Sequence, residues 1–285
     1  MVPQYINQLM SSFLLYLDNK IMVKGLAYSS VGTNFYKINT PVNGYVTYAA
    51  PYKQIVADQS VGAPLFTGLY INNNYVRTCV SGLAAINYNE GQLYFTSDPN
   101  TTSVSGNYSI KNFDIYLTDR SDQEILFETK YTQRPKTPQT MSGLTNDQIQ
   151  YPCIFLKHTQ LENEPYELGG NELTTVTVEG IVMSDSQYKL DAILNICSDL
   201  VRTNVALFNW NEWPYDGLGN YRSGVIFNYN AIAATKNPTP DSAYINNVKS
   251  SKLNYLGMKE FSSINPNVYP ALIEFELVKM RRPRS

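Results

Sequence analysis

The chain has 285 residues, of which 43% are hydrophobic, 13% are aromatic and only 16% are charged. This composition excludes intrinsic disorder, because disordered chains are poor in aromatic residues and rich in charge. A formal net charge of −2 argues against nucleic acid as a ligand, because proteins that bind its phosphate backbone need a basic face. Surface polarity must come largely from amides, hydroxyls and the 23 tyrosines, which suit contacts with other proteins, other copies or sugars.

Residues 3–21 predict a helix that packs into a core. Pro3 suits a first helical turn. The polar positions carry amides and hydroxyls and lack the Lys and Arg that helices on a membrane surface use. No apolar run reaches the length of a membrane span, so we expect no membrane contact. The apolar residues recur every three or four positions, at Ile6, Leu9, Met10, Phe13, Leu14, Leu17 and Ile21.

From residue 30 to 131 the apolar period changes to two, and turn residues arrive about every ten positions, as in antiparallel strands. Residues 69–76 predict a hairpin around three asparagines, and residues 86–95 predict a second hairpin around Gly91. Two further strands are expected near residues 113–117 and 125–131. Together these patterns predict an all-β sandwich or partial barrel.

Residues 134–140 contain two prolines and no core residue, so they are the best candidate for a domain boundary. Beyond them we expect strands at 153–156, 173–183, 225–229, 244–253 and 271–280. A capping box with Ser184 as N-cap and Gln187 at N3 predicts a long helix ending near Asn204. The apolar stripe of this helix is Leu190, Ile193, Leu194, Cys197, Leu200 and Val201.

The predicted fold class is α+β: an all-β sandwich or partial barrel domain, and an antiparallel sheet domain with one long helix. A two-layer sheet with one helix leaves much of a face uncovered, so we expect the N-terminal helix to pack on the second domain. Residues 1–29 would then belong with residues 141–285. Residues 30–134 would form an inserted β domain.

The sequence contains few residues or motifs that could support catalysis. His158 is the sole histidine, which excludes zinc sites with two histidines and helical metalloprotease motifs. No Gly-rich turn has the spacing of a phosphate loop or a dinucleotide fingerprint. We expect a chain that is not an enzyme, with no catalytic residue, cofactor or metal. Cys79, Cys153 and Cys197 are expected to be reduced core thiols.

The loop at residues 208–221 contains both tryptophans. Trp210, Trp213 and Tyr215 lie among amides and carboxylates, which is typical of a sugar platform and equally of a loop anchor or subunit contact. Glycoside hydrolysis needs two carboxyl groups across a cleft, and spacing in the sequence does not establish such a pair. The acidic candidates would be Glu162, Glu164 and Glu167 in one segment, and Glu212 and Asp216 in the other.

Several segments resemble virion structural proteins of tailed bacteriophages, closest to the neck or head-completion proteins between portal and tail. These segments are Ala50-Pro51-Tyr52-Lys53-Gln54, residues 68–72, residues 127–131 before Arg134-Pro135, Glu162-Asn163-Glu164-Pro165 and residues 180–188. The resemblance implies a homo-oligomeric ring without catalysis. Its partners would be portal, connector or tail components, in a virion assembled in the host cytoplasm.

The residues leave an alternative open, a carbohydrate-binding β-rich adhesion module that uses Trp210, Trp213 and Tyr215. For the ring, we expect the contact with another chain to come from one of two places. One is the hairpin of Asn72, Asn73, Asn74 and Tyr75, and the other is the Trp210–Tyr215 loop.

Overall fold

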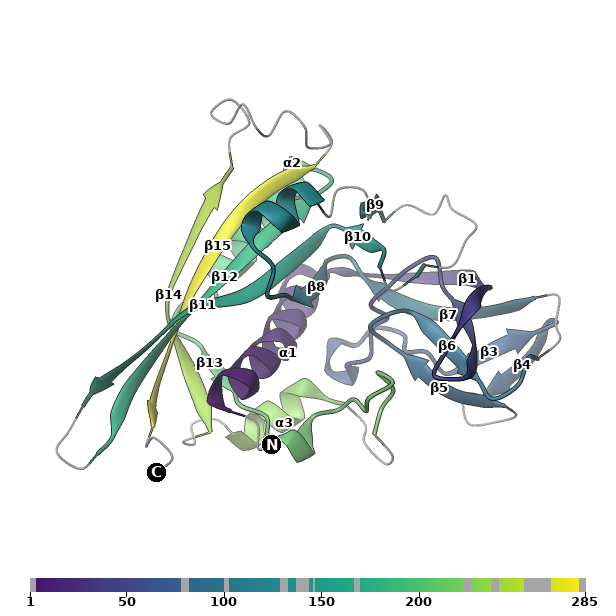
Figure 1. The fold of residues 1–285 in the computed structure, drawn as a ribbon, viewed down its shortest axis with the longest axis horizontal. Coiled ribbons are helices and arrows are strands. Elements are labelled where there is room, and N and C mark those ends of the chain that lie inside the picture. The colour runs from purple at the N-terminus through teal and green to yellow at the C-terminus, as the bar shows by residue number, and fades with distance from the viewer. Residues whose placement is uncertain are drawn as a thin grey trace.

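The computed structural model describes residues 4–77, 82–99, 103–128, 133–136, 144–145, 147–166, 170–222, 227–236, 241–253 and 268–281. Two curled half-barrel sheets lie on either side of the N-terminal helix (Figure 1). The predicted fold class is confirmed: the chain is α+β and mainly β, with a few helices, and the N-terminal helix contacts the elements of the second sheet. Of the predicted domain boundary at residues 134–140, Arg134 and Pro135 lie in the short strand β9 (Gln133–Pro135) and Lys136 follows it, whereas residues 137–140 lie outside the described residues.

The first sheet has seven antiparallel strands in the order β4-β3-β7-β1-β2-β6-β5. Both predicted hairpins are confirmed. Asn72 and Asn73 connect β3 to β4 with φ of 48° and 66°, which asparagine tolerates, and Gly91 takes φ of 64° between β5 and β6. The strands are β1 (Tyr28–Val42), β2 (Tyr45–Ala49), β3 (Gly68–Ile71), β4 (Asn74–Arg77), β5 (Leu83–Asn87), β6 (Gln92–Phe95) and β7 (Val104–Lys111).

The second sheet has six strands in the order β13-β14-β15-β12-β11-β8. They are β8 (Asp114–Leu117), β11 (Cys153–Pro165), β12 (Glu172–Ser184), β13 (Asn204–Ala206), β14 (Ser242–Lys252) and β15 (Tyr269–Arg281). All neighbours are antiparallel except β8 and β11. The strand at residues 113–117 was expected in the first sheet, and that placement is wrong. Alternation of apolar residues predicts a strand but does not identify its partner. A separate parallel pair joins β9 (Gln133–Pro135) to β10 (Ile149–Tyr151).

Three α-helices occur in the described residues: α1 (Tyr5–Gly25), α2 (Gln187–Ser198) and α3 (Tyr229–Lys236). The predicted N-cap of α2 is wrong by two residues. Ser186 caps the helix by accepting a hydrogen bond from the Lys189 N–H, whereas Ser184 ends β12 and donates to the Ser186 carbonyl. The helix ends at Ser198, earlier than expected.

Two predicted strands are wrong in their described parts. Residues 124–128 form a π-helical turn, η2 (Glu124–Glu128), and Thr129 and Tyr131 lie outside the described residues. Tyr229, expected to end a strand, begins α3, and Val225 lies outside the described residues. Short 3-10 helices complete the fold at η1 (Gln59–Val61) and η4 (Trp210–Glu212).

Helix α1 is buried on more than the predicted stripe. Leu9, Phe13 and Leu17 are fully buried, as expected, but Asp18 and Asn19 on other faces are also buried. The reason is visible in Figure 1, where α1 lies between the two sheets and not on the outside of one. The largest hydrophobic cluster accordingly contains residues of both sheets together with α1. On the side of the second sheet, Phe13 meets Phe275 of β15 edge-on, with 4.9 Å between ring centroids.

Candidate functional site

One surface pocket is lined by a residue of the predicted hairpin contact and by the last residue of the 208–221 loop, but by none of Trp210, Trp213 and Tyr215. The pocket has a volume of about 520 Å³, and its lining includes Tyr75 from β4 and Tyr221 from the end of the tryptophan-containing loop. The remaining lining residues are Gln59, Leu65, Phe66, Thr67, Arg77 and Tyr88. Aromatic rings and a few polar groups therefore converge here from segments that are far apart in the sequence.

The Tyr75 ring is held in place although half of its surface is exposed. It packs against Tyr70 with 5.3 Å between centroids, and its hydroxyl donates to Thr67 Oγ1 at 3.3 Å. Gly68 makes room for this ring: a Cβ at Gly68 would come within 2.6 Å of it. The neighbouring tip, Asn72, Asn73 and Asn74, is exposed, and its backbone conformation is fixed by the two left-handed residues.

The three aromatic residues of the loop have different environments. Trp210 is 69% exposed, and the Arg222 guanidinium lies over its ring at 5.1 Å while donating to the Trp210 carbonyl at 2.8 Å. Trp213 is half-buried and meets Tyr215 edge-on. Tyr215 itself is only 8% exposed and stacks on Tyr221 at 6.0 Å. Of the three, only Trp210 presents most of its surface to solvent.

The loop carboxylates have structural partners. Glu212 forms an ion pair with Lys236 at 2.8 Å and accepts from the Asn209 N–H at 2.7 Å. Burial alone would raise the pKa of Glu212, but these hydrogen bonds and the Lys236 charge lower it overall. Asp216 accepts from the N–H groups of Leu218 and Asn220 and so closes a turn. A glycosidase acid requires a raised pKa, which is the opposite shift to that of Glu212.

The other acidic candidates lie elsewhere. Glu162 and Glu164 are exposed on β11, and Glu167 is outside the described residues. His158 is also exposed on β11, opposite Val178. The structure therefore does not bring the two acidic groups into the pocket. No cluster of three or more His, Cys, Asp or Glu side chains that could hold a metal is found among the described residues.

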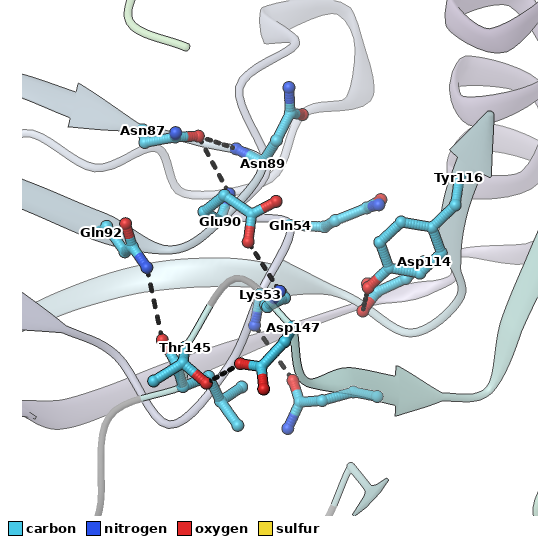
Figure 2. Close-up of polar contacts among 12 residues, drawn as sticks. Lys53, Gln54, Asn87, Asn89, Glu90, Gln92, Asp114, Tyr116, Thr145 and Asp147 are labelled. Atoms are coloured by element: carbon cyan, nitrogen blue, oxygen red, sulfur yellow. Dashed lines mark hydrogen bonds and ion pairs between the residues drawn. The ribbon is translucent and has the colours of Figure 1, made fainter. Parts of the chain in front are cut away.

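A buried polar network that the sequence analysis missed joins the two sheets (Figure 2). Lys53, 1% exposed, forms an ion pair with Glu90 at 2.6 Å, and its N–H donates to Gln150 Oε1 at 3.0 Å. The neighbouring Gln54 side chain donates to the Ile115 carbonyl at 2.7 Å and accepts from the Ile115 N–H at 3.0 Å. These hydrogen bonds tie residues 51–54, on the side of the first sheet, to β8 of the second sheet.

Buried charges continue this network. Asp114 is fully buried, forms an ion pair with Lys136 and accepts from the Tyr116 hydroxyl at 3.2 Å. Burial raises the pKa of Asp114, and the Lys136 charge opposes that shift. None of these residues lines the pocket, so their role is to fix the junction between the sheets. A signal was present in the sequence: Lys53 and Gln54 interrupt an otherwise apolar run at residues 49–57.

Cys153 and Cys197 are buried free thiols, as expected, and Cys79 lies outside the described residues. Burial raises the pKa of Cys197 to about 12, and that of Cys153 rises for the same reason. At the end of β15, the Arg281 guanidinium lies over the Tyr5 ring at 4.8 Å. Among the described helices, none is both long enough and apolar enough to cross a membrane.

No protein-family model matches this chain, and no curated protein matches it.

Proposed function

We propose that this chain is a non-enzymatic structural component of a tailed-phage virion that assembles into a homo-oligomeric ring at the head–tail neck. The observation that carries the proposal is the pair of exposed aromatic residues, Tyr75 and Trp210, each held in place by neighbouring side chains. The sequence resemblance to neck and head-completion proteins supports the same function. The partners would be further copies of the chain and portal, connector or tail components.

Aromatic side chains that neighbouring residues fix in place before binding suit this function for a physical reason. Tyrosine, tryptophan and arginine dominate the binding energy of protein interfaces, because they bury large areas and lose little conformational entropy. A ring that is already fixed before binding costs less to immobilise than a freely rotating one. Trp210 with Arg222, and Tyr75 with Tyr70, are arranged in this way. The low charge of the chain further reduces the desolvation cost of contacts.

The buried junction between the sheets is also consistent with a ring component. A subunit that bears load between head and tail must keep its two parts in one orientation. The Lys53–Glu90 and Lys136–Asp114 ion pairs fix that orientation in the protein interior. A buried charge that loses its partner is strongly destabilising, so relative movement of the sheets would be opposed.

A carbohydrate-binding module has one observation in its favour, the 69% exposure of the Trp210 ring. Sugars stack on exposed aromatic faces beside hydrogen-bonding groups. Two features weaken this alternative. Arg222 already lies over the Trp210 ring, and the Tyr215 ring is buried within the loop.

The experiment is sedimentation velocity of the purified full chain beside three variants. We expect the wild type to sediment as an oligomer, and Tyr75→Ala or Trp210→Ala to shift it toward smaller species. Tyr188→Ala is the matched control, because Tyr188 is 85% exposed and no ring contact is recorded for it among the described residues. A wild type that stays monomeric, alone and with purified portal or tail proteins, would refute the proposal. Glycan-array binding that is lost in Trp210→Ala would favour the alternative.

A further inference from the structure

Two strands of the second sheet, β11 and β14, have outer edges that are only partly paired within the described residues. β8 covers β11 only at residues 153–156, so the outer edge of residues 157–165 has no partner strand in the described part of the chain. On the other side, β13 covers β14 only at residues 242–244, leaving residues 246–252. Figure 1 shows β11 and β12 running together beyond the helices, with β14 on the other side of the sheet. Such edges present N–H and C=O groups that can pair with another strand.

Both edges are regular over most of their length. Each has one bulge near its start, between His158 and Gln160 in β11 and between Ile245 and Asn247 in β14. Beyond the bulges, residues 160–165 and residues 247–252 keep an unbroken register with their inner neighbours. Residues 158–165 are all exposed, and they include Leu161, an apolar side chain that is 40% exposed. Proteins commonly blunt free edges with proline, bulges or charge. Here the bulges lie only near the start of each edge and the one proline lies at the end of β11, so the charged side chains are what limits pairing along the regular stretches.

The charges on the two edges are complementary. The regular part of the free β11 edge, residues 160–165, carries Glu162 and Glu164, and the regular part of the free β14 edge, residues 247–252, carries Lys249 and Lys252. Lys157, at the start of the free β11 edge, is already paired with Asp122 and Glu179, and Lys252 is paired with Asp191 of α2. Pairing two copies of the same edge would bring like charges together, which is destabilising in a cross-strand position. Pairing unlike edges brings carboxylates next to ammonium groups. Lys249 is 65% exposed in its ion pair with Glu274, so it remains accessible to a second carboxylate.

We propose, resting on the ring assembly above, that the β11 edge of one copy pairs with the β14 edge of the next copy and continues the sheet from subunit to subunit. The two contact surfaces differ, so the association is head-to-tail, and such contacts close into rings when the rotation between copies allows it. Main-chain hydrogen bonds supply the affinity, and the charged side chains select the partner edge.

The positions of β8 and β13 determine the strand direction. Both short strands lie at the beginning of the strand that they cover, next to residues 153–156 of β11 and 242–244 of β14. In a parallel pairing, β8 of one copy and β13 of the next would occupy the same place. In an antiparallel pairing, β8 of one copy and β13 of the next lie beyond opposite ends of the paired stretch and do not collide. Glu162 opposite Lys249 then places residues 160–164 against residues 251–247, all within the regular stretches.

Charge reversal tests the partner choice. Glu162→Lys and Lys249→Glu should each raise the concentration needed for assembly by about tenfold or more, since a favourable cross-strand pair becomes a repulsive one. The double variant, Glu162→Lys with Lys249→Glu, should recover assembly. Lys189→Glu is the matched control, because Lys189 is another exposed lysine in an ion pair and lies on α2, in neither edge strand. Its assembly should equal that of the wild type.

Disulfide trapping tests the register. A chain with Glu162→Cys and Lys249→Cys should form a ladder of disulfide-linked oligomers under mild oxidation, whereas Glu162→Cys with Ser250→Cys should not. If the wild type is an oligomer but shows neither the ladder nor the charge effect, the edge pairing is wrong and the ring proposal stands. If the wild type is monomeric and no ladder forms, both are wrong.

Discussion

Asp18 on α1 and Lys111 at the end of β7 form an ion pair with 2.8 Å between Oδ2 and Nζ, and both side chains are more than nine-tenths buried. The pair ties the central helix to the first sheet. The next residue, Asn19, adds a second tie by donating to Asp58 Oδ2 at 2.8 Å. Because the apolar contacts of α1 reach the second sheet, the helix is the element through which the two sheets are held together.

Removal of one partner of this pair should be strongly destabilising. Lys111→Met leaves the Asp18 carboxylate buried without its cation, and such losses cost about 3–5 kcal/mol. The double variant, Asp18→Asn with Lys111→Met, should recover a large part of that loss, because no buried charge is left unpaired. Urea unfolding measures both. Lys189→Met, which breaks an exposed pair with Asp185, should cost no more than about 1 kcal/mol. Equal losses of stability in Lys111→Met and Lys189→Met would contradict the role assigned to the buried Asp18–Lys111 pair.

Gly91 should not tolerate a side chain. Its φ is 64°, and a Cβ there would lie 2.1 Å from the Tyr52 carbonyl oxygen, so the backbone at residues 52–53 would have to move. We expect Gly91→Ala to lower the free energy of unfolding by roughly 2 kcal/mol or more. Gly217→Ala is the control, since nothing lies within 4 Å of its Cβ position. Similar melting temperatures for the two variants would show that this turn is less constrained than its geometry indicates.

Stability should fall at alkaline pH, in part through Tyr16. Burial raises the pKa of Tyr16 to about 12, although its hydrogen bond with Thr203 opposes the shift. The unfolded chain releases this proton near pH 10 and the folded chain does not, so this contribution to stability is complete below about pH 10 and is lost as the pH rises through about 12. Between about pH 9 and about pH 11, the wild type should lose about 1 kcal/mol more than Tyr16→Phe. Tyr188→Phe, at an exposed position, should follow the wild type.

The buried thiols should react only when the chain unfolds. A thiol must ionise to attack a maleimide, and burial that raises the pKa of Cys197 to about 12 leaves almost no thiolate near neutral pH. Mass spectrometry of labelled peptides should find Cys153 and Cys197 unmodified in the native chain and modified in urea. Rapid native labelling of either residue would contradict its placement in the core.

Local patterns predicted the elements well where the chain itself fixes the geometry. The hairpin at Asn72 and Asn73 and the turn at Gly91 depend on residues that tolerate positive φ, and both occur as predicted. The stripe of α1 was also visible. The pairing of β8 with β11 could not be found in this way, because period-two alternation is the same for any partner strand. Burial of a second side of α1 could not be predicted either, because it arises only when both sheets pack around the helix.

The candidate site shows the same limits. Sequence reasoning selected the hairpin and the tryptophan-containing loop, but it could not show that Tyr75 and Tyr221 line one pocket. Nor could it separate exposed Trp210 from buried Tyr215, since both are aromatic residues in one polar loop. Exposure of a loop side chain depends on what packs beneath the loop, here Tyr88 and Phe227.

Assembly is the central claim, and electron microscopy of the purified full chain tests it most directly. Negative-stain class averages, with the particle mass measured by sedimentation on the same sample, should show closed rings whose mass is a whole-number multiple of the chain mass. Single particles of one chain mass at every concentration, with and without purified portal or tail proteins, would contradict it.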